Sequence, residues 1–97
     1  MRVIRPLVYR NRVIVKGIVR YANRRAGLVA VLTLERSFTV FENLTGKVSI
    51  GDLVSWTELH PKGVRTVSNL THDTLMRVLF RHHRVRFAQL RALLDED

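Results

Sequence analysis

Residues 16–33 read KGIVRYANRRAGLVAVLT, and this stretch decides the fold that we expect. A run rich in Val and Ile, with Gly17 inside it, leads into NRRAG (23–27) and then into the almost entirely apolar LVAVLTL (28–34). β-Branched residues favour strands, whereas Asn and Gly favour turns. The stretch therefore predicts a strand, a tight turn and a second strand. The apolar character of 28–34 further indicates that the second strand is buried on both faces or strongly bent.

Similar runs continue on both sides of this stretch, and turn residues such as Gly51-Asp52 and HPKG (60–63) separate them. Apolar residues that alternate with polar ones between Gly, Pro and Asp are typical of short strands joined by turns. Five strands in a chain of 97 residues indicate a mainly β protein with one small antiparallel barrel of the OB type. We expect these strands at residues 7–22, 28–34, 38–44, 53–56 and 64–70.

The hydrophobic period changes after Thr71 from two residues to about three and a half. Because no Gly or Pro follows Gly63, and Thr71 or Asp73 can act as an N-cap, we expect a helix over about residues 73–94. At about 1.5 Å per residue it would be about 33 Å long, so it either overhangs the barrel or breaks near RHHRVR (81–86). Its apolar stripe consists of Met76, Phe80, His83, Phe87, Leu90 and Leu94.

This apolar stripe must be covered, because a row of large apolar side chains in water promotes aggregation. Three arrangements remain open: the helix folds against the barrel, two helices pair in a homodimer, or the helix docks on a partner protein. We accordingly expect a barrel over residues 1–71 and, over residues 72–97, a helical extension that packs on the barrel or mediates self-association.

Positive charge is concentrated at one end of the chain. There are 17 Lys and Arg residues against eight Asp and Glu residues, for a net charge of +9. Residues 1–25 hold eight of these cations and no acidic residue. A basic segment of this kind indicates a polyanionic partner, most often nucleic acid. The eight cations are Arg2, Arg5, Arg10, Arg12, Lys16, Arg20, Arg24 and Arg25.

Three separated segments resemble the cold-shock domain family. KGIVRYANRRAG (16–27) is similar to the family's opening pattern, K-G-x-V-K-W-F-N-x-x-K-G, VSIGDLVSW (48–56) to its glycine-turn-strand, G-x-x-V-x-F, and KGVRTVSNLT (62–71) to its last strand, K-G-x-x-A-x-N-V. The resemblance spans residues 16–71. It implies a five-stranded OB-type barrel that binds single-stranded RNA or DNA on the face built from strands two and three.

The chain departs from this family where the family carries its aromatic rings. Tyr21-Ala22 stands in place of the family's Trp-Phe, AGLVA (26–30) in place of its K-G-F-G-F, and FTVFE (38–42) in place of its V-F-V-H-F. Stacking on an aromatic ring contributes about 1–3 kcal/mol per base, so these losses argue against base stacking as the main binding mode. We expect phosphate contacts to dominate, with Phe41 as a replacement for one outward ring.

We therefore expect a nucleic-acid-binding protein, a regulator or a chaperone-like protein, that contacts mainly phosphates through an Arg-rich barrel face. Its ligand is expected to be single-stranded RNA or DNA, with duplex also possible. The alternative is a protein-interaction or dimerisation module on a scaffold that has lost most nucleic-acid binding. The residues expected at the nucleic-acid face are Lys16, Arg20, Tyr21, Asn23, Arg24, Arg25, Phe41, Lys62 and Arg65.

Other classes of function are not indicated. The chain has no cysteine, and its four histidines lack a spacing that would complete a metal site with an acidic residue, so we expect no metal and no cofactor. No motif of an enzyme active site is present, and we expect no catalysis and no small-molecule substrate. Because no apolar run approaches the length of a membrane span, a soluble protein is expected, and the absence of cysteine fits a reducing cytoplasm. The four histidines are His60, His72, His82 and His83.

Overall fold

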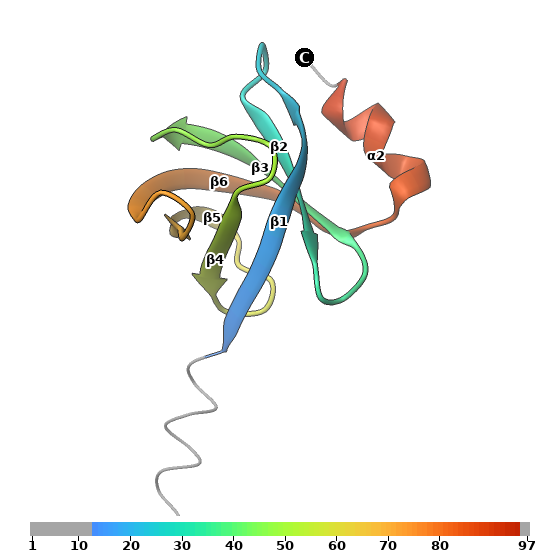
Figure 1. Ribbon diagram of the computed structural model, residues 1–97. Helices are drawn as coiled ribbons and strands as arrows, with labels where there is room; N and C mark the ends of the chain where they lie inside the picture. Colours follow the sequence, from blue (N-terminus) through green and yellow to red (C-terminus); the bar gives the residue numbers. More distant parts are fainter. Residues whose placement is uncertain (1–12, 96–97) are drawn as a thin grey trace, which may run out of the picture.

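The computed structural model describes residues 13–95. These residues form six strands and one helix (Figure 1). The parts of the predicted first strand and of the helical extension that fall on residues 7–12 and 96–97 lie outside the described residues. The elements are β1 (Ile14–Asn23), β2 (Leu28–Thr33), β3 (Phe38–Thr45), β4 (Leu53–Thr57), β5 (Gly63–Asn69), β6 (Thr74–Val85) and α2 (Phe87–Leu94).

The strands close into a barrel in the order β1-β2-β3-β6-β5-β4, with β4 pairing back to β1. Every neighbouring pair is antiparallel. Strand direction must then alternate around the closed ring, which requires an even number of strands. The expected mainly β, antiparallel barrel is confirmed, but the expected number of five strands is wrong. β6 lies between β3 and β5 and completes the ring.

The sixth strand replaces most of the predicted helix. Residues 74–85 are extended and pair with both β3 and β5, so the prediction of a helix over 73–94 is wrong for this part. Met76 and Phe80 project into the barrel core, where they are 1% and 6% exposed. Their spacing of four residues is even, and therefore fits one face of a strand as well as one face of a helix. Hydrogen-bonded pairing with β3 and β5 makes these residues a strand and not a helix.

Strand β2 confirms the expected burial on both faces. Val29 and Val31 point into the barrel core. Leu28 and Ala30 point outward, yet they are buried too, because they lie in a second apolar cluster that includes Leu90 of α2. A strand that is covered on both sides has no face that needs polar residues, which explains the sequence LVAVLT.

Helix α2 packs along the outer face of β2 and β3 (Figure 1). Leu90 is 2% exposed and anchors this contact, with Leu93 and Leu94 partly buried beside it. At the first turn the Arg86 backbone N–H donates to Oε1 of Gln89 at 3.3 Å. At the other end Nδ2 of Asn23 donates to the Leu94 carbonyl oxygen at 2.6 Å. Helix α2 therefore packs on its own barrel, which is one of the three arrangements left open.

Gly17 sits where β1 passes very close to β2. A Cβ atom added there would lie 2.7 Å from the Leu32 carbonyl oxygen and would also overlap Cγ1 of Val31. Three residues later, at Arg20, the register of the same strand pair shifts, because Val19 pairs with Val31 while Tyr21 pairs with Ala30. Arg20 is the extra residue of this β-bulge. Among the described residues, no helix is long and apolar enough to cross a membrane.

Candidate nucleic-acid interface

Four of the predicted cations lie on β1 and on the turn that follows it. Lys16, Arg20, Arg24 and Arg25 are all exposed. None of them forms an ion pair within residues 13–95, and the first acidic residue of the described chain is Glu35. The structure therefore places on β1 and its turn four exposed cations that form no ion pair with a carboxylate of residues 13–95.

The β-bulge decides what β1 shows to solvent. A regular strand would turn Arg20 and Tyr21 to opposite faces, but both are exposed, and Tyr21 keeps 40% of its surface accessible. An extra residue in one strand re-aims the side chains next to it. As a result a guanidinium group and an aromatic ring stand next to each other on the same strand.

Lys62 and Arg65 do not join this group. Ile14, at the start of β1, pairs with Thr57, at the end of β4, so the loop between β4 and β5 lies at the opposite end of the barrel from the turn at residues 24–27. Arg65 is also engaged locally, because its Nη1 lies 3.1 Å from Oε1 of Glu58 and its Nε donates to the Lys62 carbonyl oxygen at 3.0 Å. A phosphate would have to compete with Glu58 for this side chain.

Phe41, which we expected to point outward, is fully buried. Its ring is 0% exposed and makes edge contacts with Trp56 and Phe80. The outward ring of β3 is Phe38, three positions earlier and therefore on the other face of the strand. Phe41 is a core residue in this fold and offers no surface to a base.

Three rings from three different elements form a cluster beside α2. Tyr21, Phe38 and Phe87 have centroid separations of 5.8, 6.0 and 6.4 Å. Phe38 lies buried at 7% exposure, whereas Phe87 is 67% exposed. The sequence placed Phe87 in an apolar helix stripe, and nothing local in the sequence distinguished it from the buried Leu90. Only the packing of α2 reveals it as a surface ring next to Tyr21.

A cleft of about 780 Å³ runs between α2 and the end of β1. The two exposed rings, Tyr21 and Phe87, line it together with the guanidinium groups of Arg24 and Arg91. Asp95 also lines the cleft, and its Oδ2 lies 4.0 Å from Nε of Arg91. A second hollow of about 590 Å³ at the end of the barrel shares Ala22, Asn23, Arg24 and Ile50 with the first. We call the two together the rim groove.

Asn23 contributes to the rim groove mainly as a structural residue. Its Nδ2 donates a hydrogen bond to the Leu94 carbonyl oxygen, and its Oδ1 accepts one from the Ala26 backbone N–H at 3.2 Å. The second bond is the turn-stabilising contact that Asn favours at such positions. The first is a long-range contact that holds the end of α2 against the turn.

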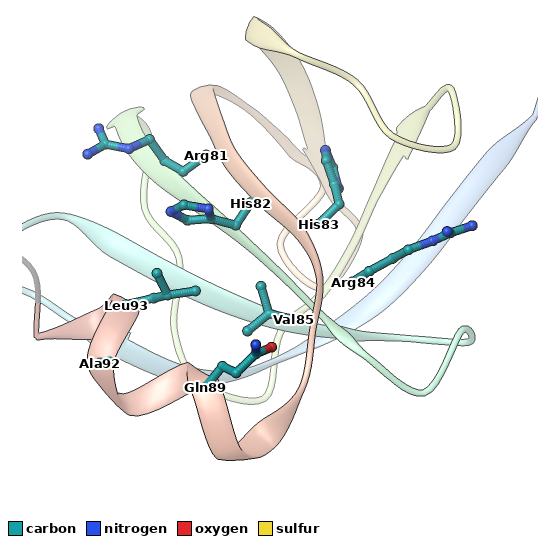
Figure 2. A pocket seen from close by; sticks show the side chains of 8 residues that line it. All are labelled: Arg81, His82, His83, Arg84, Val85, Gln89, Ala92 and Leu93. Atoms are coloured by element: carbon teal, nitrogen blue, oxygen red, sulfur yellow. The ribbon is translucent and has the colours of Figure 1, made fainter.

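A separate hollow, also of about 590 Å³, lies on the other flank of α2 and is lined by Arg81, Arg84 and two histidines (Figure 2). Arg81 and His82 extend from β6 to one side of the strand, whereas His83 and Arg84 extend to the other (Figure 2). Much of this charge is compensated. Nη1 of Arg81 lies 3.0 Å from Oε1 of Glu42, and Nε of Arg84 lies 3.7 Å from Oε2 of Glu35. Both arginines of this hollow therefore lie beside a carboxylate.

His83, expected in a helical stripe, instead ties β6 to its neighbours. Its Nε2 lies 2.7 Å from the Pro61 carbonyl oxygen, and its Nδ1 lies 3.1 Å from Oγ1 of Thr39. Because a carbonyl oxygen only accepts, Nε2 carries the proton, and in the neutral ring Nδ1 accepts from the Thr39 hydroxyl. Burial lowers the pKa of His83 although the Pro61 hydrogen bond opposes the shift; nearby His60 and His82 lower it further and Glu35 raises it.

This lowered pKa predicts a loss of stability in mild acid. The free histidine side chain titrates near pH 6.5, so below about this pH the unfolded chain binds the proton more readily than the folded chain does. The free energy of unfolding should therefore fall as the pH drops from about 6.5 towards the folded-state pKa. Urea unfolding at a series of pH values, with and without His83→Gln, measures the effect.

The expected result is a flatter pH dependence of the free energy of unfolding in His83→Gln than in the wild type. The series should stay above about pH 4.5. Below that range Asp52 contributes as well. Burial opposes ionisation of Asp52, but hydrogen bonds from Asn69 and Ser49 and the nearby His72 outweigh it, so the pKa of Asp52 is lowered and its stabilising effect is lost only in stronger acid. An unchanged slope in His83→Gln would contradict the prediction.

No family model, curated protein or solved structure matches this chain. Within the described residues, no group of three His, Asp or Glu side chains is arranged to hold a metal ion.

Proposed function

We propose that this protein binds nucleic acid, and that the cations of β1 and of the following turn contact backbone phosphates. The observation that carries the proposal is the row Lys16, Arg20, Arg24 and Arg25, which is exposed and has no ion pair within residues 13–95. A guanidinium group matches the geometry of a phosphate and binds the phosphate through two parallel hydrogen bonds. The net charge of +9 attracts a polyanion to this face from a distance.

We further propose that the barrel is a divergent relative of the OB-type barrels of cold-shock domains, in a regulator or a chaperone-like protein of the cytoplasm. In support, the three segments that resemble the family lie on β1 and its turn, on the loop before β4 with β4 itself, and on β5 with the residues that flank it on both sides. Strand β6 and helix α2 have no counterpart in the family's pattern. They follow the last matched segment, so they extend the resembled pattern at its end.

The alternative, dimerisation through a C-terminal helical stripe, has less support. Three of the six residues expected in that stripe, Met76, Phe80 and His83, belong to β6. Leu90 is buried against β2 and β3 of the same chain, and Leu94 is partly buried beside it. Phe87 alone keeps a large exposed apolar surface on α2, and one side chain is too little for a stable helix seam.

Charge reversal tests the proposed phosphate contacts. We expect the triple variant Arg20→Glu, Arg24→Glu and Arg25→Glu to bind oligonucleotides about 100-fold more weakly at low salt, because each lost contact also removes the gain from counterion release. The logarithm of the binding constant should depend less steeply on the logarithm of the salt concentration, by about 0.7 per lost contact on single strands. Fluorescence anisotropy at several salt concentrations measures both quantities.

A second triple variant controls for net charge. Arg36→Glu, Lys62→Glu and Arg77→Glu change the charge by the same amount at exposed positions on other elements. This variant should retain most of the affinity and the salt dependence. Equal losses in both variants would show that no localised site exists. Absence of binding by the wild-type protein at low salt, with RNA and DNA and with single and double strands, would reject the proposed function.

A further inference from the structure

We infer that Tyr21 of β1 and Phe87 of α2 form a stacking platform for unpaired bases, so that the rim groove selects single-stranded over duplex nucleic acid. This inference rests on the proposed function, and it adds a base contact to a site otherwise defined by phosphate contacts. It places the stacking surface on two elements that meet only in the folded chain.

The geometry of the ring cluster supports the platform. The centroids of Tyr21 and Phe87 are 6.0 Å apart with an interplanar angle of 45°, so the rings contact each other at an angle and no base fits between them. Both rings instead rest on the buried Phe38, at 5.8 and 6.4 Å. Tyr21 keeps 40% and Phe87 67% of their surface exposed. A base can therefore stack on their outer surfaces without any rearrangement of the core.

Tyr21 stands where the resembled family carries a ring, but the rest of the face that the family would use, on β2 and β3, is covered here. On that outer face of β2 and β3, the exposure of Leu28, Ala30, Phe38 and Val40 is 4%, 0%, 7% and 1%. These residues pack with Leu90 of α2, so no base can reach them. Helix α2 thus covers one apolar surface and, through Phe87 at its first turn, provides an aromatic ring at the edge of the covered area.

The surroundings of the two rings fit a nucleotide. The rings line the cleft of about 780 Å³ together with the apolar side chains of Ile50 and Leu94. Arg24 lies in the same cleft and has no ion pair within the described part of the chain, so it can take the phosphate of a stacked nucleotide. An aromatic surface beside an unneutralised cation is the combination used for sequence-tolerant binding of single strands.

Duplex nucleic acid cannot use this platform. In a duplex the faces of the bases are stacked on their neighbours, and only the edges of the base pairs and the backbone are accessible. A duplex should therefore bind through the cations alone. The platform predicts a higher affinity for a single strand than for a duplex of the same length, and this difference should depend on the rings.

A matched pair of oligonucleotides separates stacking from phosphate contacts. The first probe is a short, fluorescently labelled oligothymidylate, and the second is an oligonucleotide of the same length whose sites are all abasic. The two carry the same backbone phosphates and differ only in the bases. The wild-type protein should bind the oligothymidylate about tenfold or more tightly than the abasic strand, because each stacked base contributes to affinity.

Phe87→Leu removes the ring but keeps an apolar side chain over Phe38. We expect it to weaken binding to the oligothymidylate about fivefold to tenfold and to leave binding to the abasic strand unchanged. Tyr21→Leu should act in the same way. Phe87→Trp keeps an aromatic ring at this position. The fluorescence of the new tryptophan should be quenched by the oligothymidylate and not by the abasic strand. Trp56 is 4% exposed in the core, so its own signal is subtracted by comparison with the wild type.

The outcomes distinguish this inference from the proposed function on which it rests. If the wild type binds both strands equally and Phe87→Leu changes neither, the platform is rejected while phosphate binding stands. If neither strand binds at low salt, the proposed function itself is rejected. A loss of affinity for both strands in Phe87→Leu, with an unchanged unfolding midpoint, would also overturn the inference, because base stacking cannot affect an abasic strand.

Discussion

Replacing Phe41 with alanine is expected to lower the free energy of unfolding by about 3–5 kcal/mol. The ring is 0% exposed and lies at the centre of the barrel core. It makes edge contacts with Trp56 and Phe80 at centroid distances of 6.4 and 5.6 Å, and all of them are lost on truncation. The closed barrel cannot collapse into the resulting cavity without shifting several strands at once. Urea unfolding followed by circular dichroism measures the change.

Phe87→Ala is the matched control, because it deletes the same atoms from a ring that is 67% exposed. It should cost about 1 kcal/mol or less. If Phe41→Ala leaves the barrel unfolded, Phe41→Leu keeps the test quantitative, with an expected loss of about 1.5 kcal/mol or less. Equal small effects at positions 41 and 87 would mean that Phe41 is not in the core. Nucleic-acid binding by folded Phe41→Leu should match the wild type.

Leu90→Asp is expected to release α2 from the barrel. Leu90 is 2% exposed and packs with Ala30, Phe38 and Val40, so an aspartate there would bury a carboxylate among apolar groups. An isolated buried charge costs several kcal/mol, more than an eight-residue helix recovers from its remaining contacts. The helix should then unfold locally, because so short a helix is unstable in water. The barrel should remain folded, because β1 to β6 close it without α2.

Hydrogen exchange followed by mass spectrometry locates this effect. Residues 87–94 should lose protection in Leu90→Asp while the strands of the barrel keep theirs, and the dye ANS should bind the uncovered face of β2 and β3. Ala92→Asp adds the same charge at an exposed position of the same helix and should leave protection unchanged. Protected residues 87–94 in Leu90→Asp would contradict the role assigned to Leu90. Release of α2 should also abolish the preference for single strands while phosphate binding persists.

Local sequence predicted the first five strands because their signals are short-range. Runs of Val and Ile, glycines and the polar turn after β1 depend on a few neighbouring residues, and within the described residues each predicted strand overlaps a strand of the structure. The burial of β2 on both faces was also visible, because LVAVLT has no polar face. The row of cations on β1 could be predicted in the same way, since a shortage of nearby acidic residues can be counted along the chain.

Residues 74–85 were predicted wrongly because their pattern fits two periods. Met76, Val78 and Phe80 alternate with Arg77, Leu79 and Arg81, which is a strand pattern, but Leu75 and Leu79 extend it into a helical stripe. Leu, Met and Arg also favour helices. The strand is nevertheless formed, because β3 and β5 each need a hydrogen-bonding neighbour and only β6 can lie between them with antiparallel pairing on both sides.

The amino-acid sequence by itself indicated the barrel's first five strands, the apolar character of both faces of β2 and the cations of β1 and its turn, because these depend on residue type and local spacing. The tertiary structure alone decided that β6 closes the ring, that Phe41 points inward, and that α2 covers the outer face of β2 and β3. It also decided that Tyr21 and Phe87, 66 positions apart in the chain, share one surface. The physical reason is that strand pairing and helix docking satisfy backbone hydrogen bonds and bury apolar area between distant segments, and no local pattern encodes such partners.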